Sequence, residues 1–253
     1  MAEKTATMTF ESVMSGLKAG NYAPSYLLMG EEAYYIDQIA DFIAEHAIKP
    51  EERDFNQQIV FGADVTGAQV ADMARSYPVM AERQVIIVKE AQNIKNWDQL
   101  ERYLEKPAKT TVLVVCYKNG TIDGRKKILT RFKNAGVVFE SKKKRDYELP
   151  PFIEAYLKKR TKVTIENKAA QMLADHIGAD LSRLTGEIDK LLLSLEEGDT
   201  RITPQMVEKR IGISKDFNAF ELRSAIAAKD VVKANLILKY FDSNPKTGGA
   251  FAL

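Results

Sequence analysis

The stretch SYLLMGEEAYYIDQI, residues 25–39, has the order in which a nucleotide-binding loop begins: a short apolar strand, a glycine and an amphipathic helix. A phosphate-binding loop reads G-x-x-x-x-G-K-[ST]. Its glycines let backbone N–H groups approach the phosphates, its lysine meets the β/γ oxygens and its hydroxyl holds Mg²⁺. Here Gly30 is followed by Glu31, Glu32 and Ala33, without the second glycine or the lysine. The sequence therefore predicts the scaffold of a nucleotide site that lacks its phosphate-binding part.

The strand expected to carry the acidic partner of such a loop is also unsuited to that role. In an ATPase of this architecture an apolar strand ends in Asp or Asp-Glu, so that a carboxylate holds magnesium or orients water. The strand TVLVVCYKNG ends instead in Cys116, Tyr117, Lys118 and Asn119, and a lysine at this place repels a metal ion. Because two separate parts of the site are missing, we expect no catalytic residue, no cofactor and no ATP binding.

The histidines and the cysteine form no catalytic or ligating pattern. His46 and His176 fall in separate predicted helices, and neither has Cys, Asp or Glu neighbours at metal-site spacing. Cys116 lies in an apolar strand, where a small core residue is the expected role, and as the single cysteine it cannot form an internal disulfide. We therefore expect no metal site.

Three basic clusters, Arg125–Lys127, Lys142–Arg145 and Lys158–Arg160, carry charges that could contact a phosphate backbone. Acidic residues nearly balance them, since the net charge of the chain is +2. The aromatic residues that a single-strand binding platform requires are not interleaved with them. A solvated surface or a linker is the favoured interpretation, and weak, nonspecific DNA contact stays open as the alternative.

The segment RSYPVMAERQVIIV, residues 75–88, places large apolar residues in a predicted turn: Tyr77, Val79 and Met80. A helix over 66–76 precedes the turn, Pro78 opposes its continuation and a buried strand follows. Apolar side chains in a turn either fold back onto the core or stand exposed as an anchor for a partner. From the pattern alone, packing onto the core is favoured.

The elements that position these residues belong to a chain of 253 residues and 28.4 kDa, enough for one large domain or two ordinary ones. Its composition, 45% hydrophobic and 28% charged, is that of a soluble globular protein. The N-terminus lacks the pattern of a signal peptide, and apolar runs are too short to span a bilayer. With a single cysteine, a reduced, cytoplasmic protein is expected.

Strands and helices alternate in the first half of the chain. Apolar runs predict strands at 26–29, 57–62, 84–88, 111–116 and 137–139. Helical patterns lie at 32–48, 66–76, 97–104 and 124–134, the last with Asp123 as a possible N-cap. The stripe Ile36, Ile39 and Ile43 has helical spacing. This alternation predicts an α/β domain with a mostly parallel sheet, residues 1–144.

The second half is predicted to be helical. Pro150–Pro151 mark the boundary, and beyond them KVTI is the one candidate strand. A helical bundle is expected over 145–212, with one apolar stripe closed by Gly198 and with Thr203 as N-cap before Pro204. The stripe consists of Leu181, Leu184, Ile188, Leu191 and Leu195. Two further helices follow within 213–253, and two helices make a poor independent core.

Four segments, taken in order, resemble the delta subunits of the bacterial DNA polymerase III clamp loader. They are YLLMGEEAYYIDQI, PVMAERQVIIVKEA, DLSRLTGEIDKLLL and FNAFELRSAIAAKDVVKANLIL, between about residues 25 and 241. The resemblance implies an AAA+-like architecture: an α/β domain over 1–144, a helical lid over 145–212 and the start of a helical collar over 213–253. Since only the first two collar helices precede Leu253, we expect a C-terminally truncated chain.

The resemblance also implies a role without an active site. Members of this family do not hydrolyse ATP. They bind the ring-shaped sliding clamp, the beta subunit, and favour its opening for loading onto primed DNA, while the collar joins them to the tau/gamma and delta-prime subunits. The family's apolar anchor pair falls here on Val79 and Met80, and Tyr77 matches a third anchor position. The family often has a larger Leu-Phe type pair. The resemblance therefore reverses the preference above, and we expect the turn to be exposed.

Two other interpretations remain open from the sequence. The first is a divergent NTPase with an unrecognised phosphate site. The second is another DNA-binding or loader-associated module, such as a delta-prime-like subunit. That protein usually carries a zinc-binding cysteine cluster, and the single cysteine of this chain argues against it.

Overall fold

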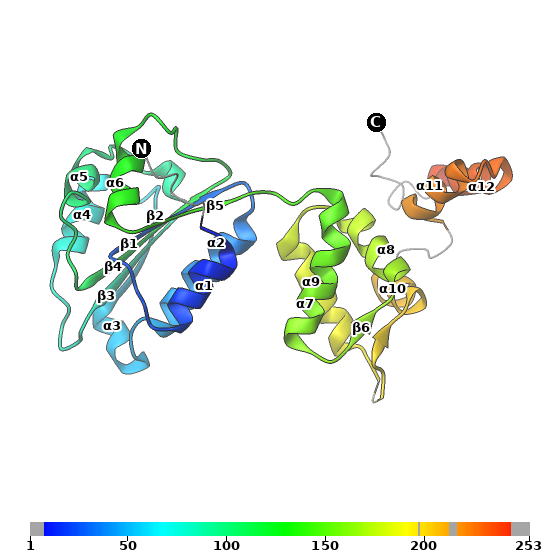
Figure 1. Cartoon of the computed structure of the whole chain (residues 1–253), viewed down its shortest axis with the longest axis horizontal. Coiled ribbons are helices and arrows are strands. Elements are labelled where there is room, and N and C mark those ends of the chain that lie inside the picture. The colour runs from blue at the N-terminus through cyan, green and yellow to red at the C-terminus, as the bar shows by residue number, and fades with distance from the viewer. Residues whose placement is uncertain (1–7, 197, 213–216, 244–253) are drawn as a thin grey trace, which may run out of the picture. The chain divides into compact units, whose positions relative to one another are not determined.

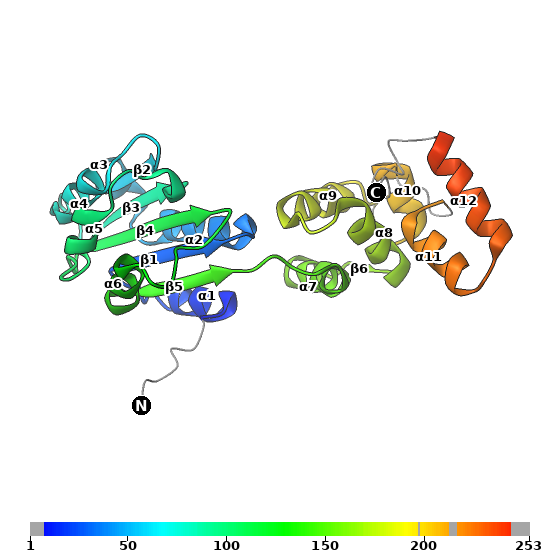
Figure 2. The same ribbon diagram turned by 90° about the horizontal axis from the view of Figure 1, so that it is seen from above.

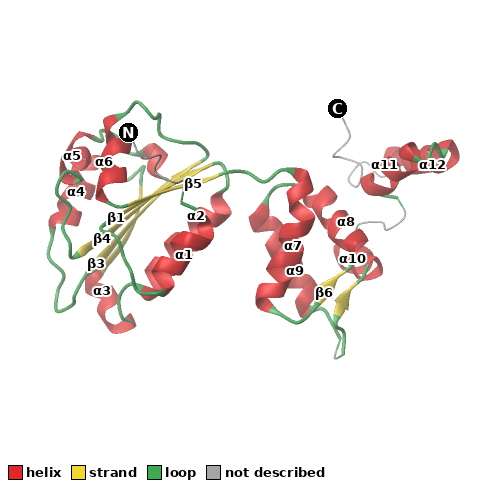
Figure 3. Cartoon of the chain, in the orientation of Figure 1, coloured by secondary structure: helices red, strands yellow, loops and turns green. Residues whose placement is uncertain are grey.

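The computed structural model describes residues 8–196, 198–212 and 217–243. The chain divides into two compact units, residues 1–143 and 144–253 (Figure 1). The first unit is a layered α/β structure, and the second consists almost entirely of helices (Figure 3). The predicted finer division into 1–144, 145–212 and 213–253 stays a prediction.

The first unit is built on a five-stranded parallel sheet with the strand order β2-β3-β4-β1-β5 (Figure 2). The strands are β1 (Ser25–Gly30), β2 (Gln57–Phe61), β3 (Gln84–Lys89), β4 (Thr111–Lys118) and β5 (Val137–Ser141). All five predicted strands are confirmed. The β-branched runs in β3 and β4 are buried on both faces, as expected of parallel strands covered by helices on each side.

Helices cover both faces of this sheet (Figure 1). On one face lie α1 (Phe10–Lys18) and α2 (Ala33–His46). On the other lie α4 (Gly67–Arg75), α5 (Asp98–Tyr103) and α6 (Lys127–Ala135). Leu27 packs in the core of the second face and Leu28 in the core of the first, since successive residues of a strand point to opposite faces. The predicted stripe Ile36, Ile39 and Ile43 of α2 is fully buried against the sheet.

Short elements complete the first unit. They are α3 (Arg53–Asn56), which leads into β2, and the 3-10 turns η1 (Pro50–Glu52) and η2 (Ala91–Asn93). The sequence analysis missed α1 and α3. The prediction of Asp123 as the N-cap of α6 is wrong. Its carboxylate accepts the N–H of Arg125 at 2.9 Å within a separate turn, and α6 begins only at Lys127.

The second unit begins with η3 (Asp146–Glu148) and contains the helices α7 (Leu149–Arg160), α8 (Asn167–Ile177), α9 (Leu181–Leu193) and α10 (Pro204–Ile211). The strands β6 (Thr164–Ile165) and β7 (Arg201–Ile202) form a small parallel pair. Thr203 caps α10 ahead of Pro204, as predicted. The predicted α9 stripe is buried from Leu181 to Leu191, but the helix ends at Leu193, before Leu195. The Ser194 hydroxyl donates to the Leu191 carbonyl at 2.8 Å and helps to close this end.

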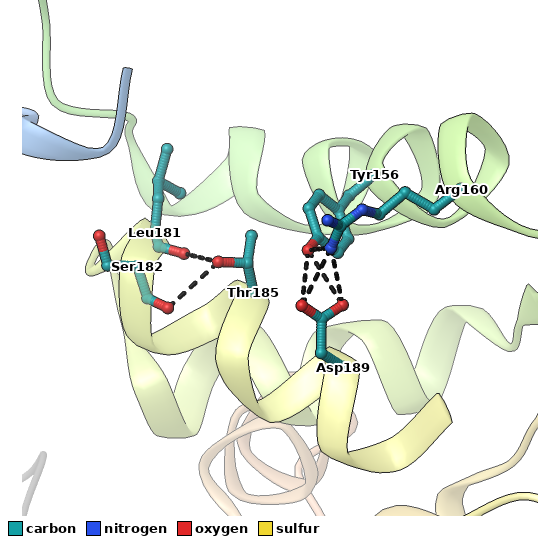
Figure 4. Close-up of polar contacts among 6 residues, drawn as sticks. All are labelled: Tyr156, Arg160, Leu181, Ser182, Thr185 and Asp189. Carbon is teal, nitrogen blue, oxygen red and sulfur yellow. Dashed lines mark hydrogen bonds and ion pairs between the residues drawn. The ribbon is translucent and has the colours of Figure 1, made fainter. Parts of the chain in front are cut away.

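A polar contact joins α7 to α9 (Figure 4). The Asp189 carboxylate on α9 accepts from the Tyr156 hydroxyl at 3.0 Å and from the Arg160 guanidinium at 3.0 Å, both on α7. One turn earlier on α9, the Thr185 hydroxyl donates to the Leu181 carbonyl at 2.9 Å, so this buried hydroxyl has a hydrogen-bond partner within its own helix. The α7–α9 register is thus fixed by one carboxylate in addition to the leucine core.

The last described elements are α11 (Ala219–Ala227) and α12 (Val231–Ser243). Glu221, buried on α11, pairs with Lys168 of α8 at 2.6 Å and also with Lys233 of α12. Several apolar side chains of α12 are exposed, including the neighbours Val231 and Val232. Within the residues that the structure describes, there is no helix long and apolar enough to cross a membrane.

Candidate partner-binding site

The segment between α4 and β3, residues 76–83, carries several exposed apolar side chains and is called the docking loop below. Tyr77 is 86% exposed, Val79 54% and Met80 97%. The interpretation that the pattern alone favoured, packing onto the core, is therefore wrong for this turn. The expectation of an exposed turn is met, and the role of the three residues as anchors stays a prediction.

The start of the docking loop is fixed by a buried amide. The Gln84 side chain donates to the Ser76 carbonyl at 2.5 Å, the Met73 carbonyl at 3.2 Å and the Thr111 hydroxyl at 3.0 Å. The Thr111 hydroxyl in turn donates to the Ala74 carbonyl at 2.9 Å. Most of these bonds are accepted by carbonyls at the end of α4, where a helix runs out of its own N–H donors, and the Met73 carbonyl also accepts the Ser76 N–H at 3.2 Å. They tie this end of α4 to the first residues of β3 and β4.

The middle of the docking loop is held by a second buried amide, that of Asn56, which is 3% exposed. The Val79 N–H donates to Asn56 Oδ1 at 2.6 Å, and Asn56 Nδ2 donates to the Val79 carbonyl at 3.0 Å. Asn56 Nδ2 also donates to the Glu52 carbonyl at 3.0 Å. The sequence gives no signal for this residue, because it lies 23 positions before its partner and belongs to no recognisable motif.

Met80 follows directly after this junction and has a left-handed backbone, with φ at 52°. A non-glycine residue pays a steric cost of about 1–2 kcal/mol in this region. Such residues persist where neighbouring contacts fix the chain, and they gather at functional sites. Met80, the most exposed apolar side chain of the loop, thus also has a strained backbone conformation.

The docking loop ends in two charged residues, Glu82 and Arg83, and has aromatic residues close by. Glu82 is exposed, and Arg83 lies over the Tyr22 ring with 5.1 Å between its guanidinium carbon and the ring centre. Phe55, the neighbour of Asn56 in α3, is exposed as well. The surface near the loop therefore combines apolar side chains with charges of both signs, a composition suited to binding a protein.

At the phosphate-loop position the structure shows a closed turn. Gly30 has φ at 138°, and a Cβ placed on it would lie 2.0 Å from the Ser141 carbonyl oxygen at the end of β5, so this position requires glycine. Glu32 is buried and caps α2, because its carboxylate accepts the N–H of Tyr34 at 3.0 Å. The helix start, where a phosphate would bind, carries the chain's own negative charge.

The end of β4 is occupied by an ion pair. The Lys118 ammonium lies 2.7 Å from the carboxylate of Asp37 on α2. This is the lysine that the sequence predicts to disfavour a metal ion. Among the residues that the structure describes, no three His, Cys, Asp or Glu side chains come together as a metal site.

The two histidines and the cysteine have separate structural roles. Cys116 is buried in β4, as predicted, and burial raises the pKa of its thiol to about 12. His46 ends α2, with its Nδ1 3.0 Å from the Phe42 carbonyl and its ring stacked on Phe42. His176 is half-buried on α8, where burial lowers its pKa. Among the described residues, none of the three belongs to a cluster of His, Cys, Asp and Glu side chains that could hold a metal ion.

The basic clusters have acidic partners close by. Arg125 pairs with Asp123 at 2.7 Å, Lys142 lies 3.9 Å from Glu140, and Arg160 binds Asp189. Each cluster thus has part of its charge neutralised within its own unit, and the structure adds nothing that favours a nucleic-acid surface over a solvated one.

Comparison with known proteins gives a consistent set of relatives. The sequence model of the family "DNA polymerase III, delta subunit" matches residues 26–142, which contain the sheet and the docking loop. DNA polymerase III subunit delta of Bacillus subtilis (strain 168) is 30% identical over 230 residues, which make up 87% of this chain and 65% of that protein. This chain therefore spans somewhat less than two thirds of that relative's length.

Among solved structures, the B. subtilis DNA clamp loader delta protein YqeN matches with a TM-score of 0.64 at 25% identity, over 93% of this chain and 72% of that one. A variant of Thermotoga maritima RuvB matches with a TM-score of 0.50 at 19% identity, over 91% of this chain and 78% of that one. The second match indicates a shared fold and no more. The predicted AAA+-like fold class is confirmed.

Proposed function

We propose that the chain is a DNA polymerase III delta subunit, a member of the family whose sequence model matches its residues 26–142, and that it binds the sliding clamp through the docking loop. In this role it favours the open form of the ring, so that the clamp can be loaded onto primed DNA during replication. The observation that carries the proposal is the exposed pair Val79 and Met80, which stands on a loop whose backbone is fixed by buried amides.

The energetics of the pair suit a docking anchor. Fully burying one such apolar side chain contributes on the order of 1.5–3 kcal/mol. A few central anchors of this kind usually dominate an interface, while charged neighbours such as Glu82 and Arg83 adjust association rate and register. Methionine adapts to irregular apolar pockets, so the Val-Met pair is compatible with a pocket that also accepts larger residues.

The proposal includes no chemical step. The closed turn at Gly30 and the capping carboxylate of Glu32 support a frame that has kept the AAA+ sheet without nucleotide binding. ATP binding then belongs to sister subunits, of the tau/gamma kind. The exposed apolar side chains of α12 are a suitable contact for those subunits and for delta-prime.

The decisive experiment changes Val79 and Met80 together to serine and measures clamp affinity and melting temperature on the same protein. We expect at least about a hundredfold weaker clamp binding, near 2.8 kcal/mol, with little change in melting temperature. The matched control is a pair of consecutive exposed apolar residues on α12. They are Val231 and Val232, whose side chains are 67% and 72% exposed. Changing that pair to serine should leave clamp affinity as it is.

Two results would contradict the proposal. One is a well-folded V79S/M80S protein that binds the clamp as tightly as the unaltered chain. The other is an equal loss of clamp affinity in the α12 control, which would make the effect a general one of lost apolar surface.

A further inference from the structure

We propose that Asn56 is a positioning residue that holds the docking loop in the conformation that presents Val79 and Met80 to the sliding clamp. This inference rests on the proposed clamp-binding function and adds to it how the anchor is held ready. Asn56 is almost completely buried at the end of α3, and it acts through the loop backbone without contacting the clamp itself.

The hydrogen bonds of Asn56 are fully used. Its two Nδ2 hydrogens go to the Glu52 and Val79 carbonyls, and its Oδ1 accepts the Val79 N–H. The side chain thus donates to and accepts from one residue, as a neighbouring strand does in a hydrogen-bonded pair. An aspartate lacks the donor, and leucine or alanine lacks both functions. Because the bonds reach across 23 residues, they fix the loop against α3.

The placement of Met80 depends on this junction. Met80 follows Val79 and has the left-handed backbone described above, a conformation that persists only when the surrounding contacts impose it. Gln84 fixes the loop at Ser76, and Asn56 fixes it at Val79. In the described part of the chain, Asn56 is the side chain that hydrogen-bonds the Val79 backbone. Without Asn56, Val79, the residue directly before Met80, loses the hydrogen bonds that hold its backbone next to the strained geometry.

The consequence for binding is a population effect. When only a fraction of molecules holds the binding conformation, the apparent affinity falls by that fraction. An unlocked loop that holds the binding conformation about one tenth of the time therefore binds the clamp about tenfold more weakly. The loss falls mainly on the association rate, because the loop must reach the correct conformation before Val79 and Met80 can enter their pocket.

The test compares Asn56→Ala and Asn56→Asp in the whole chain with the unaltered protein. Two quantities are measured: the exchange rate of the Val79 amide hydrogen in the free protein by NMR, and the rates of binding to the purified clamp by surface plasmon resonance. For Asn56→Ala we expect amide exchange at least about tenfold faster and clamp association about tenfold slower, with little change in dissociation. Asn56→Asp keeps the acceptor but turns an oxygen without a hydrogen towards the Glu52 and Val79 carbonyls, so it should also speed Val79 exchange and slow clamp association.

A buried asparagine in the other unit gives the matched control. Asn218 caps α11 by accepting the Glu221 N–H at 3.0 Å. Asn218→Ala should lower the stability of the second unit while leaving Val79 exchange and clamp association as they are. If Asn56 were only a structural residue, the two alanine variants would associate with the clamp at the same rate, whatever their difference in Val79 exchange.

The outcomes separate this inference from the proposed function. Unchanged Val79 exchange in a folded Asn56→Ala or Asn56→Asp protein overturns the inference. The inference is also overturned if Asn56→Ala speeds Val79 exchange and leaves clamp association unaltered, while the separate V79S/M80S variant does weaken clamp binding. If V79S/M80S and the unaltered chain bind the clamp equally, the proposed function fails and the inference with it. If Asn56→Ala does not fold, Asn56→Asp is judged by the same two measurements.

Discussion

Met80 combines a nearly fully exposed side chain with a left-handed backbone. The exposed side chain is available for binding, whereas the backbone conformation would be more stable with glycine. Glycine has no Cβ and adopts positive φ without the steric cost, which is about 1–2 kcal/mol for other residues. It also gives the unfolded chain more freedom, so the net gain over alanine is smaller. The proposed contact of the Met80 side chain with the clamp is consistent with both properties.

Met80→Gly and Met80→Ala should thus behave alike in binding and differently in stability. Both lose the methionine side chain, and we expect each to weaken clamp binding about tenfold or more, since one buried Met contributes on the order of 1.5–3 kcal/mol. Met80→Gly should melt at a higher temperature than Met80→Ala. Thermal unfolding and clamp titration of both variants test this, and a large drop in melting temperature in both would mean that Met80 packs onto the core.

At the residue scale, prediction from sequence succeeds where the signal is local. Val79 and Met80 could be located because a proline, a polar pair and a buried strand flank them in a fixed order. Their exposure could not be predicted from the same pattern, because an apolar turn that packs onto the core has the same sequence pattern. Asn56 gave no signal at all, since its importance comes from a contact across 23 residues that only the folded chain creates.

Among the elements, the start of α2 carries the clearest functional consequence. The N–H groups of a helix start attract a phosphate, but Glu32 already satisfies one of them here and places a carboxylate beside them. A like charge in a partly buried site repels strongly. The two buried partners of this turn, Gly30 and Ser141, also leave no room for a side chain between them.

We therefore expect the chain not to bind ATP. Isothermal titration calorimetry with ATP and magnesium should show no saturable heat. A dissociation constant in the low micromolar range, about −8 kcal/mol of binding free energy, would contradict this and favour a divergent NTPase.

The helix α8 offers a pH-dependent test in the second unit. Burial, reinforced by the charge of Arg183 and opposed by Glu187, lowers the pKa of His176 below its usual 6.5. The folded chain therefore binds this proton less readily than the unfolded chain does. The stability that the neutral ring contributes is complete above about pH 6.5 and is lost as the pH falls through the lower folded pKa.

His176→Gln should consequently lose less stability than the unaltered chain between about pH 7.5 and pH 5.5. Melting temperatures of both proteins across this range provide the measurement. Equal losses in the two proteins would show that the His176 environment does not favour the neutral ring.

Element prediction worked best for strands and long helices. The five strands of the sheet are runs of β-branched residues between turn signals, and the α2 and α9 stripes repeat at helical spacing. The misses have physical reasons. With four residues, α3 is too short to show periodicity, and Asp123 resembled an N-cap because it caps a turn instead. The α9 stripe continued in sequence to Leu195, although Ser194 closes the helix first.

On the scale of the whole molecule, each unit contains its own core, and every residue of the docking loop and its supports lies within residues 1–143. The proposed clamp contact therefore needs no residue of the second unit. We expect a protein of residues 1–143 to fold and to bind the clamp within about threefold of the whole chain, a difference below about 1 kcal/mol.

Clamp titration of residues 1–143, with circular dichroism to verify folding, tests this expectation. A folded fragment that binds more than about tenfold more weakly would show that the helical unit contributes to the contact. Introducing V79S/M80S into the fragment provides the control, since it should abolish most of the remaining affinity.

The closed turn at Gly30 also bears on how this chain can evolve. Counted from Gly30, the phosphate-loop pattern would put its second glycine at Tyr35, its lysine at Ile36 and its hydroxyl at Asp37. Ile36 is fully buried against the sheet, and Asp37 is paired with Lys118. A lysine at position 36 would point into the apolar layer and would meet no phosphate. Point substitutions alone therefore cannot create a phosphate-binding loop here, because an insertion before α2 would have to come first.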